Sequence, residues 1–192
     1  DTKEALNQLY EFVSLRKRRR KISENTFVYE LCIETVEGCA EYCGTKALSV
    51  LSADLYKKRV ADYKNKIAKD SSLLFDTRRY CYFTGALIPL LLDKLNIRFP
   101  MKIDSNTETL YEWLERLVPD IPQADESENS DEEIKKHYLN EIKRRETLFS
   151  DFYSNNTVKT EGDFFVCGYD PMNMVKAGNH ILHTHFIFLS DK

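Results

Sequence analysis

Four glutamates recur at helical spacing in the first quarter of the chain: Glu30, Glu34, Glu37 and Glu41. At roughly 100° per residue they fall within about a 60° arc of one helix face. The opposite side carries apolar and thiol side chains, namely Val28, Cys32, Val36, Cys39 and Cys43. The pattern predicts one long amphipathic helix from about residue 26 to residue 51.

Two features argue against an acidic face that is simply solvated. Like charges at this spacing repel one another by a few tenths of a kcal/mol per pair, and no Lys or Arg is interleaved between them. Gly38 also lies in mid-helix, which costs about 1 kcal/mol relative to Ala and indicates close approach of another group. The glutamates therefore suit a helix that faces a cation or a basic neighbouring segment.

The rest of the pattern is mostly helical. Apolar periodicity predicts helices over residues 3–20, 53–69, 70–97 and 106–118, and a capping box at Ser130 and Glu133 predicts another that ends near residue 153. Aromatic and β-branched residues at 163–170 and 180–190 predict a β-hairpin. The expected fold class is mainly α, a multi-helix domain with a C-terminal β-hairpin (α+β, small β content). We expect a helical core domain at 1–121, an acidic linker at 122–133, and a helix plus hairpin at 134–192 that packs on the same domain.

Composition narrows the function classes. The 192 residues carry a formal net charge of -3, which argues against a nucleic-acid partner. Five cysteines without the regular spacing of a secreted scaffold indicate free thiols and a cytoplasmic location. No apolar run approaches the roughly 18 residues of a membrane helix. A basic run, RKRRRK at 16–21, is open to three interpretations: a solvated surface, a binding patch, or a segment that neutralises a neighbouring acidic stretch.

The sequence ETVEGCAEY at 34–42 resembles the helix that supplies the third zinc ligand in gluzincin metallopeptidases. Those enzymes carry His-Glu-x-x-His on one helix and a sequence like Glu-Gly-x-Ala-x-Tyr on a later one. The resemblance implies that Glu37 binds zinc, that Glu34 orients a ligand, and that Tyr82 stabilises the oxyanion. Two further stretches are similar to other parts of such proteins: RRYCYFTGALIPLLLDKL at 78–95 and GYDPMNMVKAGNHILHTHFIFL at 168–189.

The chain departs from this family because it contains no His-Glu-x-x-His. A gluzincin zinc needs two imidazoles beside the carboxylate, and a glutamate that takes a proton from metal-bound water. We therefore expect the downstream half of a zinc-dependent metallopeptidase that acts on a peptide or protein substrate. Its zinc would depend on an upstream segment or chain that carries the missing helix, and this chain alone would be inactive. A first residue of Asp1 rather than methionine favours a fragment.

The same residues also suit a thiol hydrolase. EGCAEY resembles the opening of papain-like and transglutaminase-like enzymes, in which a helix N-terminus lowers the pKa of a nucleophilic cysteine. The resemblance implies Cys39 as the nucleophile, His185 as its base, and Asp170 or Asp191 as the group that orients the base. If the helix begins near residue 26, however, Cys39 lies in its middle, which favours a buried structural thiol.

Two alternatives remain. On a strand, His183 and His185 share a face, where Cys167 or Asp170 could complete a metal site, although ordinary hairpin side chains explain them as well. A non-enzymatic helical interaction module with a basic patch is the third candidate function.

Overall fold

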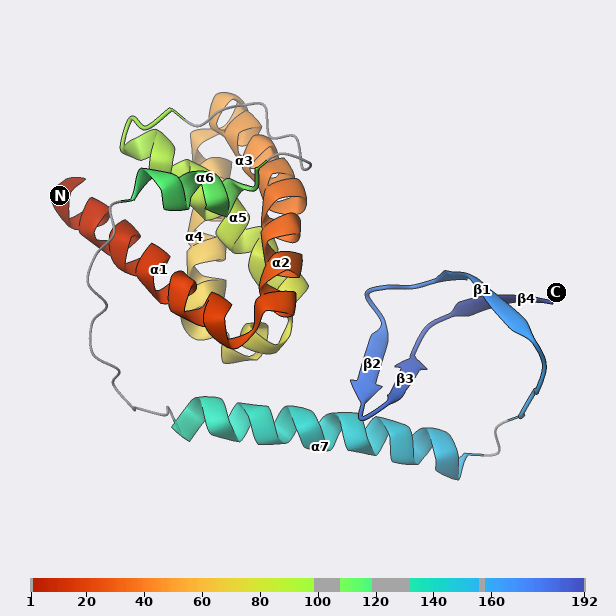
Figure 1. The fold of residues 1–192 in the computed structure, drawn as a ribbon. Helices are drawn as coiled ribbons and strands as arrows, with labels where there is room; N and C mark the ends of the chain where they lie inside the picture. Colours follow the sequence, from red (N-terminus) through yellow and green to blue (C-terminus); the bar gives the residue numbers. More distant parts are fainter. Residues whose placement is uncertain (1, 99–107, 119–131, 156–157, 192) are drawn as a thin grey trace. The chain divides into compact units, whose positions relative to one another are not determined.

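The computed structural model describes residues 2–98, 108–118, 132–155 and 158–191. The chain divides into two compact units, Asp1–Glu128 and Asn129–Lys192. The fold class is as predicted, mainly helical with small antiparallel sheets near the C-terminus (Figure 1). No helix in the described ranges combines the length and apolarity required to cross a lipid bilayer.

The described part of the first unit is helical throughout. Its elements are, in chain order, α1 (Thr2–Ile22), α2 (Glu24–Ile33), the π-helical turn η1 (Glu34–Gly38), α3 (Cys39–Leu51), α4 (Ala53–Lys69), the 3-10 turn η2 (Ser71–Phe75), α5 (Thr77–Lys94) and α6 (Leu110–Leu117). Side-chain caps explain several of the starts, because Ser52, Asp76 and Thr109 each accept a bond from a backbone N–H in the first helical turn.

The predicted helix over residues 26–51 is confirmed, but it contains a π turn. α2, η1 and α3 follow one another without a break, and Ile33 and Gly38 both keep right-handed helical dihedrals. In Figure 1 they form one continuous rod. A π turn adds a residue to the helix, and such turns are frequent at functional sites.

The hydrophobic core joins α1, α2, α5 and α6. Its buried members are Leu9, Val13, Phe27, Leu31, Ile88, Leu92, Leu110, Tyr111, Trp113, Leu114 and Val118. Where η1 crosses α5, Gly38 meets Gly85: a Cβ built on Gly38 would lie 2.5 Å from the Gly85 Cα. The close approach predicted from Gly38 is therefore confirmed.

The second unit contains α7 (Glu132–Ser154) and four short strands, β1 (Phe164–Tyr169), β2 (Met174–Ala177), β3 (His180–His183) and β4 (Ile187–Asp191). The predicted single hairpin is corrected to two nested antiparallel pairs, β1 with β4 and β2 with β3. The segment between the two predicted strands was expected to be only a connection, but it contains β2. The chain then turns from β2 to β3 through Gly178, which has a φ of +56°. No described side chain of this unit is fully buried.

The predicted acidic linker, residues 122–133, lies outside the described residues except for Glu132 and Glu133, with which α7 begins. That α7 and the strands pack on the helical domain stays a prediction.

Candidate functional site

The glutamate face of the α2–η1–α3 helix points into the protein. Glu30 is 1% exposed and Glu34 is 0% exposed, whereas Val28 and Val36 on the other side are 54% and 57% exposed. The helix thus buries two carboxylates beside the core residues Phe27 and Leu31, whereas an ordinary amphipathic surface helix turns its charged side chains to solvent. The solvated acidic face is ruled out for these two glutamates.

Arginines of α1 compensate the buried carboxylates. Nη1 of Arg16 donates to both oxygens of Glu34 at 2.8 and 2.7 Å, and Arg16 is itself buried. Nη2 of Arg19 donates to Glu30. Burial nonetheless raises the pKa of Glu30, while Arg19 and Arg16 act in the opposite direction. The prediction that RKRRRK neutralises an acidic stretch is confirmed for Arg16 and Arg19.

Aromatic rings complete the surroundings of Arg16. Its guanidinium carbon lies 4.6 Å from the ring centroid of Tyr111, 5.3 Å from that of Phe27 and 5.4 Å from that of Phe12. These distances are in the range of cation–π attraction. The Arg16 guanidinium therefore has an anionic partner and three ring faces, which suits a structural role.

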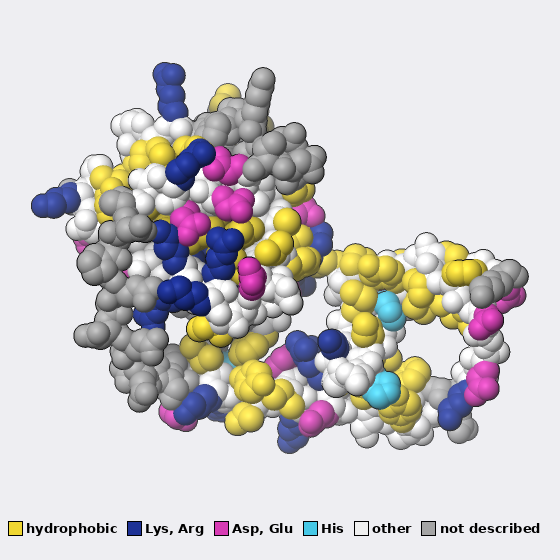
Figure 2. Space-filling view, viewed as in Figure 1, with side chains coloured by type: hydrophobic (Ala, Val, Ile, Leu, Met, Phe, Trp, Pro, Cys, Tyr) yellow, Lys and Arg dark blue, Asp and Glu magenta, His cyan; other side chains and the backbone are white. Residues whose placement is uncertain are grey.

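Two further members of the basic run, Lys17 and Arg20, face α6. Nζ of Lys17 and Nη1 of Arg20 lie 3.9 and 3.8 Å from the carboxylate of Glu115. On the face drawn in Figure 2, basic and acidic side chains of the helical unit lie among one another rather than in a patch of one sign. This arrangement favours a mixed surface over a phosphate-binding patch.

Glu37 and Tyr82, two residues singled out by the gluzincin resemblance, are brought together by Arg78. Nη2 of Arg78 donates to Glu37 at 2.7 Å, and its Nε donates to the Tyr82 hydroxyl at 3.1 Å. The side chain of Glu37 is 37% exposed and that of Arg78 is 28% exposed. Because Gly38 and Gly85 hold η1 against α5, the two helices present this cluster jointly at the surface.

The donors in this chain do not fit a zinc site. Within the described ranges, no three His, Cys, Asp or Glu side chains are grouped so that they could hold a metal. The cationic partner of Glu37 is a guanidinium, and the Glu34 carboxylate is already bonded to Arg16 and to the Thr84 hydroxyl. We therefore derive no catalytic step through a metal, and the zinc-binding role of Glu37 stays a prediction.

The residues of the thiol alternative lie in different units. Cys39 is the first residue of α3 but not the start of a helix, because the rod begins at Glu24 and continues through Cys39 to Leu51. Burial is the main cause that raises the Cys39 pKa to about 11. A nucleophilic cysteine requires the opposite shift. The half-buried thiol is better suited to packing beside the core.

His185 and Asp170 are paired as that alternative required. Nδ1 of His185 lies 2.8 Å from Oδ2 of Asp170. Oδ2 also accepts a bond from the Asn173 side chain, and Oδ1 accepts one from the Met172 backbone N–H. The pair joins the β1–β2 connection, which contains Asp170, to the β3–β4 connection, which contains His185. The predicted shared strand face of His183 and His185 is wrong, because His185 lies in the bend between β3 and β4.

Comparison with known protein families, with curated proteins and with solved structures finds no match to this chain.

The sequence analysis did not predict that the apolar face of the long helix would be exposed. We call it the outer stripe and define it as Val28, Cys32, Val36, Ala40 and Cys43, all of which are exposed. The available signal was the basic run one helix earlier, since arginines that bind Glu30 and Glu34 turn the side of the helix opposite these glutamates outward.

Proposed function

We propose that this protein is a non-enzymatic interaction module whose helical unit binds an amphipathic α-helix of a partner protein on the outer stripe. The single observation that supports this function is the exposure of apolar side chains along the α2–η1–α3 rod, on the side away from the buried Glu30 and Glu34. Contiguous apolar surface on a soluble domain is typical of an interaction site.

The shape of the outer stripe supports a helix as the ligand. Its members are spaced by four, four, four and three residues, so they line one side of the rod for several turns. The wider π turn offsets the drift that a four-residue repeat has in a regular α-helix. Ala40 and Cys43 have small side chains and the neighbouring Gly44 has none, which permits close approach of a second helix backbone.

The chemistry of the stripe supports an apolar contact. None of its five members is charged, and the nearest acidic groups along the rod, Glu37 and Glu41, already contact Arg78 and Arg59. A partner helix with apolar side chains at positions i, i+4 and i+7 would match it, as in other helix-on-groove complexes.

Selection of helical peptides from a displayed library tests this proposal. Peptides selected on the protein should carry apolar residues at helical spacing and should lose at least tenfold in affinity against Val36→Lys. Ile22→Lys is the matched control, because Ile22 ends α1, outside the rod, and is 85% exposed. Binding that is equally affected by both variants, or by neither, contradicts the proposal. If the protein forms a dimer that Val36→Lys dissociates, a second copy covers the stripe, and this result also contradicts the proposal.

A second candidate keeps the metallopeptidase resemblance. Glu37 directly follows Val36, so a helix docked on the outer stripe would pass beside the Glu37–Arg78–Tyr82 cluster. Such a helix would have to bring both imidazoles and the general base. For the chain alone we expect no chelator-sensitive proteolysis. If such proteolysis were found, it would contradict the view that this chain lacks part of the zinc site.

A further inference from the structure

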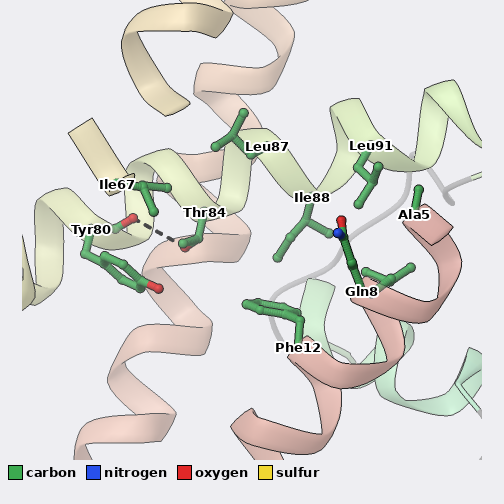
Figure 3. Close-up of a pocket in the computed structure, with 10 residues that line it drawn as sticks. Ala5, Gln8, Phe12, Ile67, Tyr80, Thr84, Leu87, Ile88 and Leu91 are labelled. Atoms are coloured by element: carbon green, nitrogen blue, oxygen red, sulfur yellow. Dashed lines mark hydrogen bonds between the residues drawn. The ribbon is translucent and has the colours of Figure 1, made fainter. Parts of the chain in front are cut away.

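A cavity of about 310 Å³ opens between α1, α4 and α5, in the helical unit but apart from the outer stripe. Gln8 and Phe12 line it from α1, Ile67 from α4, and Tyr80, Thr84 and Leu87 from α5 (Figure 3). This volume is at the lower end of the range for small-molecule pockets, roughly 300–1,000 Å³. The described residues therefore leave room for a small ligand between these helices.

The lining of the cavity, which is open to solvent on one side, favours an uncharged ligand over a charged one. No Asp, Glu, Lys, Arg or His is among the described residues that line it. The nearest buried charges are the Arg16–Glu34 pair, which are bonded to each other, and Glu34 also accepts a bond from the Thr84 hydroxyl. A carboxylate or an ammonium group in this cavity would lose its hydration without gaining an opposite charge.

Two polar groups are left for a ligand. Gln8 is an exposed residue at the rim, and Tyr80 is half-buried; among the described residues, neither the Gln8 amide nor the Tyr80 hydroxyl has a hydrogen-bond partner. Burial raises the pKa of Tyr80, so its hydroxyl keeps its proton. In Figure 3 the Gln8 amide extends toward Ile88 and Leu91, on the apolar side of the cavity. An amide donates and accepts, so it suits a hydroxyl or a carbonyl group.

From these observations we infer a binding site for a neutral, mostly hydrocarbon small molecule that carries one hydroxyl or carbonyl group. Its chain or ring would contact Phe12, Ile67 and Leu87, and its polar group would bond to the Gln8 amide.

Titration with N-phenylnaphthylamine, an uncharged dye that fluoresces in apolar sites, tests this inference. We expect one dye per chain, displaced by octanol, with octanoate at least tenfold weaker as a competitor. Ala5→Phe, which fills the cavity from α1, should weaken dye binding at least tenfold. Ala68→Phe on α4 is the matched control, since it is exposed and outside the lining, and should change binding less than twofold.

Leu87→Phe repeats the test from α5 if Ala5→Phe disturbs folding, which circular dichroism would detect. Gln8→Leu should weaken the binding of octanol more than the binding of the dye. Absence of stoichiometric dye binding, equal binding by the filled and control variants, or equal competition by octanoate and octanol would each overturn the inference. The peptide-binding test above uses a different face, so either result can fail without the other.

Discussion

Gly38 and Gly85 meet where the α2–η1–α3 rod crosses α5, so closely that a Cβ added to Gly38 would lie 2.5 Å from the Gly85 Cα and 3.1 Å from the Cys81 carbonyl oxygen. These neighbours are backbone atoms, which cannot move aside as a side chain does. We expect Gly38→Ala to lower the free energy of unfolding by about 1–3 kcal/mol, as overpacking does. Urea denaturation measures this change.

Gly44→Ala provides the control, because Gly44 lies in the same rod and a Cβ there would meet nothing within 4 Å. It should raise the free energy of unfolding by about 0.5–1 kcal/mol, since Ala is the better helix former. Equal effects of the two substitutions would show that the rod does not cross α5 at Gly38.

Cysteine reactivity separates the structural and catalytic roles of Cys39. Burial raises the pKa of Cys39 to about 11 and that of Cys81 to about 12, so both thiols stay protonated at pH 8. Iodoacetamide followed by mass spectrometry should label the exposed Cys32 and Cys43 at least tenfold faster than these two. The same reaction on urea-unfolded protein is the control and should remove the difference.

Rapid labelling of Cys39 would instead favour the thiol hydrolase. If any hydrolase activity is found, Cys39→Ala decides the matter: activity that survives the substitution excludes Cys39 as the nucleophile.

The Asp170–His185 pair predicts a local acid transition. Hydrogen bonds from His185, Asn173 and the Met172 backbone hold the Asp170 pKa at about 2, below its ordinary value of 3.8. A lowered pKa stabilises the fold above the ordinary value, and this contribution is lost as the pH falls from about 4 to about 2. The Met172 amide resonance should therefore titrate with a midpoint near pH 2. Asp170→Asn should abolish this transition, and a midpoint near 4 would contradict the pairing.

Periodicity was sufficient to predict most of the helices because side-chain burial repeats with the helical turn. The predicted helix over residues 70–97 is corrected to the 3-10 turn η2 followed by α5, because Asp76 caps the start of α5. The rod over 24–51, the capped helix after Thr109 and the close approach at Gly38 all follow from local pattern. The inner strand Met174–Ala177 was missed because four residues between a proline and a glycine give too short an alternation to separate a strand from a turn.

The orientation of the rod could not be derived from its own residues. Periodicity identifies two faces but not which of them is inside, and that choice depends on Arg16 and Arg19, which belong to another helix. The same limit applies to Glu37 and Tyr82, which are 45 positions apart in sequence (82 minus 37) and lie together only through Arg78.

The central claim is that arginines on α1, rather than water or a metal, compensate the buried glutamates, and a double-mutant cycle on Arg16 and Glu34 tests it most directly. Arg16→Met or Glu34→Leu alone leaves a buried charge without its partner and should cost about 3–5 kcal/mol in urea denaturation. Combining the two should cost clearly less than their sum, a coupling of at least about 2 kcal/mol. For comparison, the same cycle on the half-exposed Arg78–Glu37 pair should give about 1 kcal/mol or less. A coupling near zero between Arg16 and Glu34 would contradict the account.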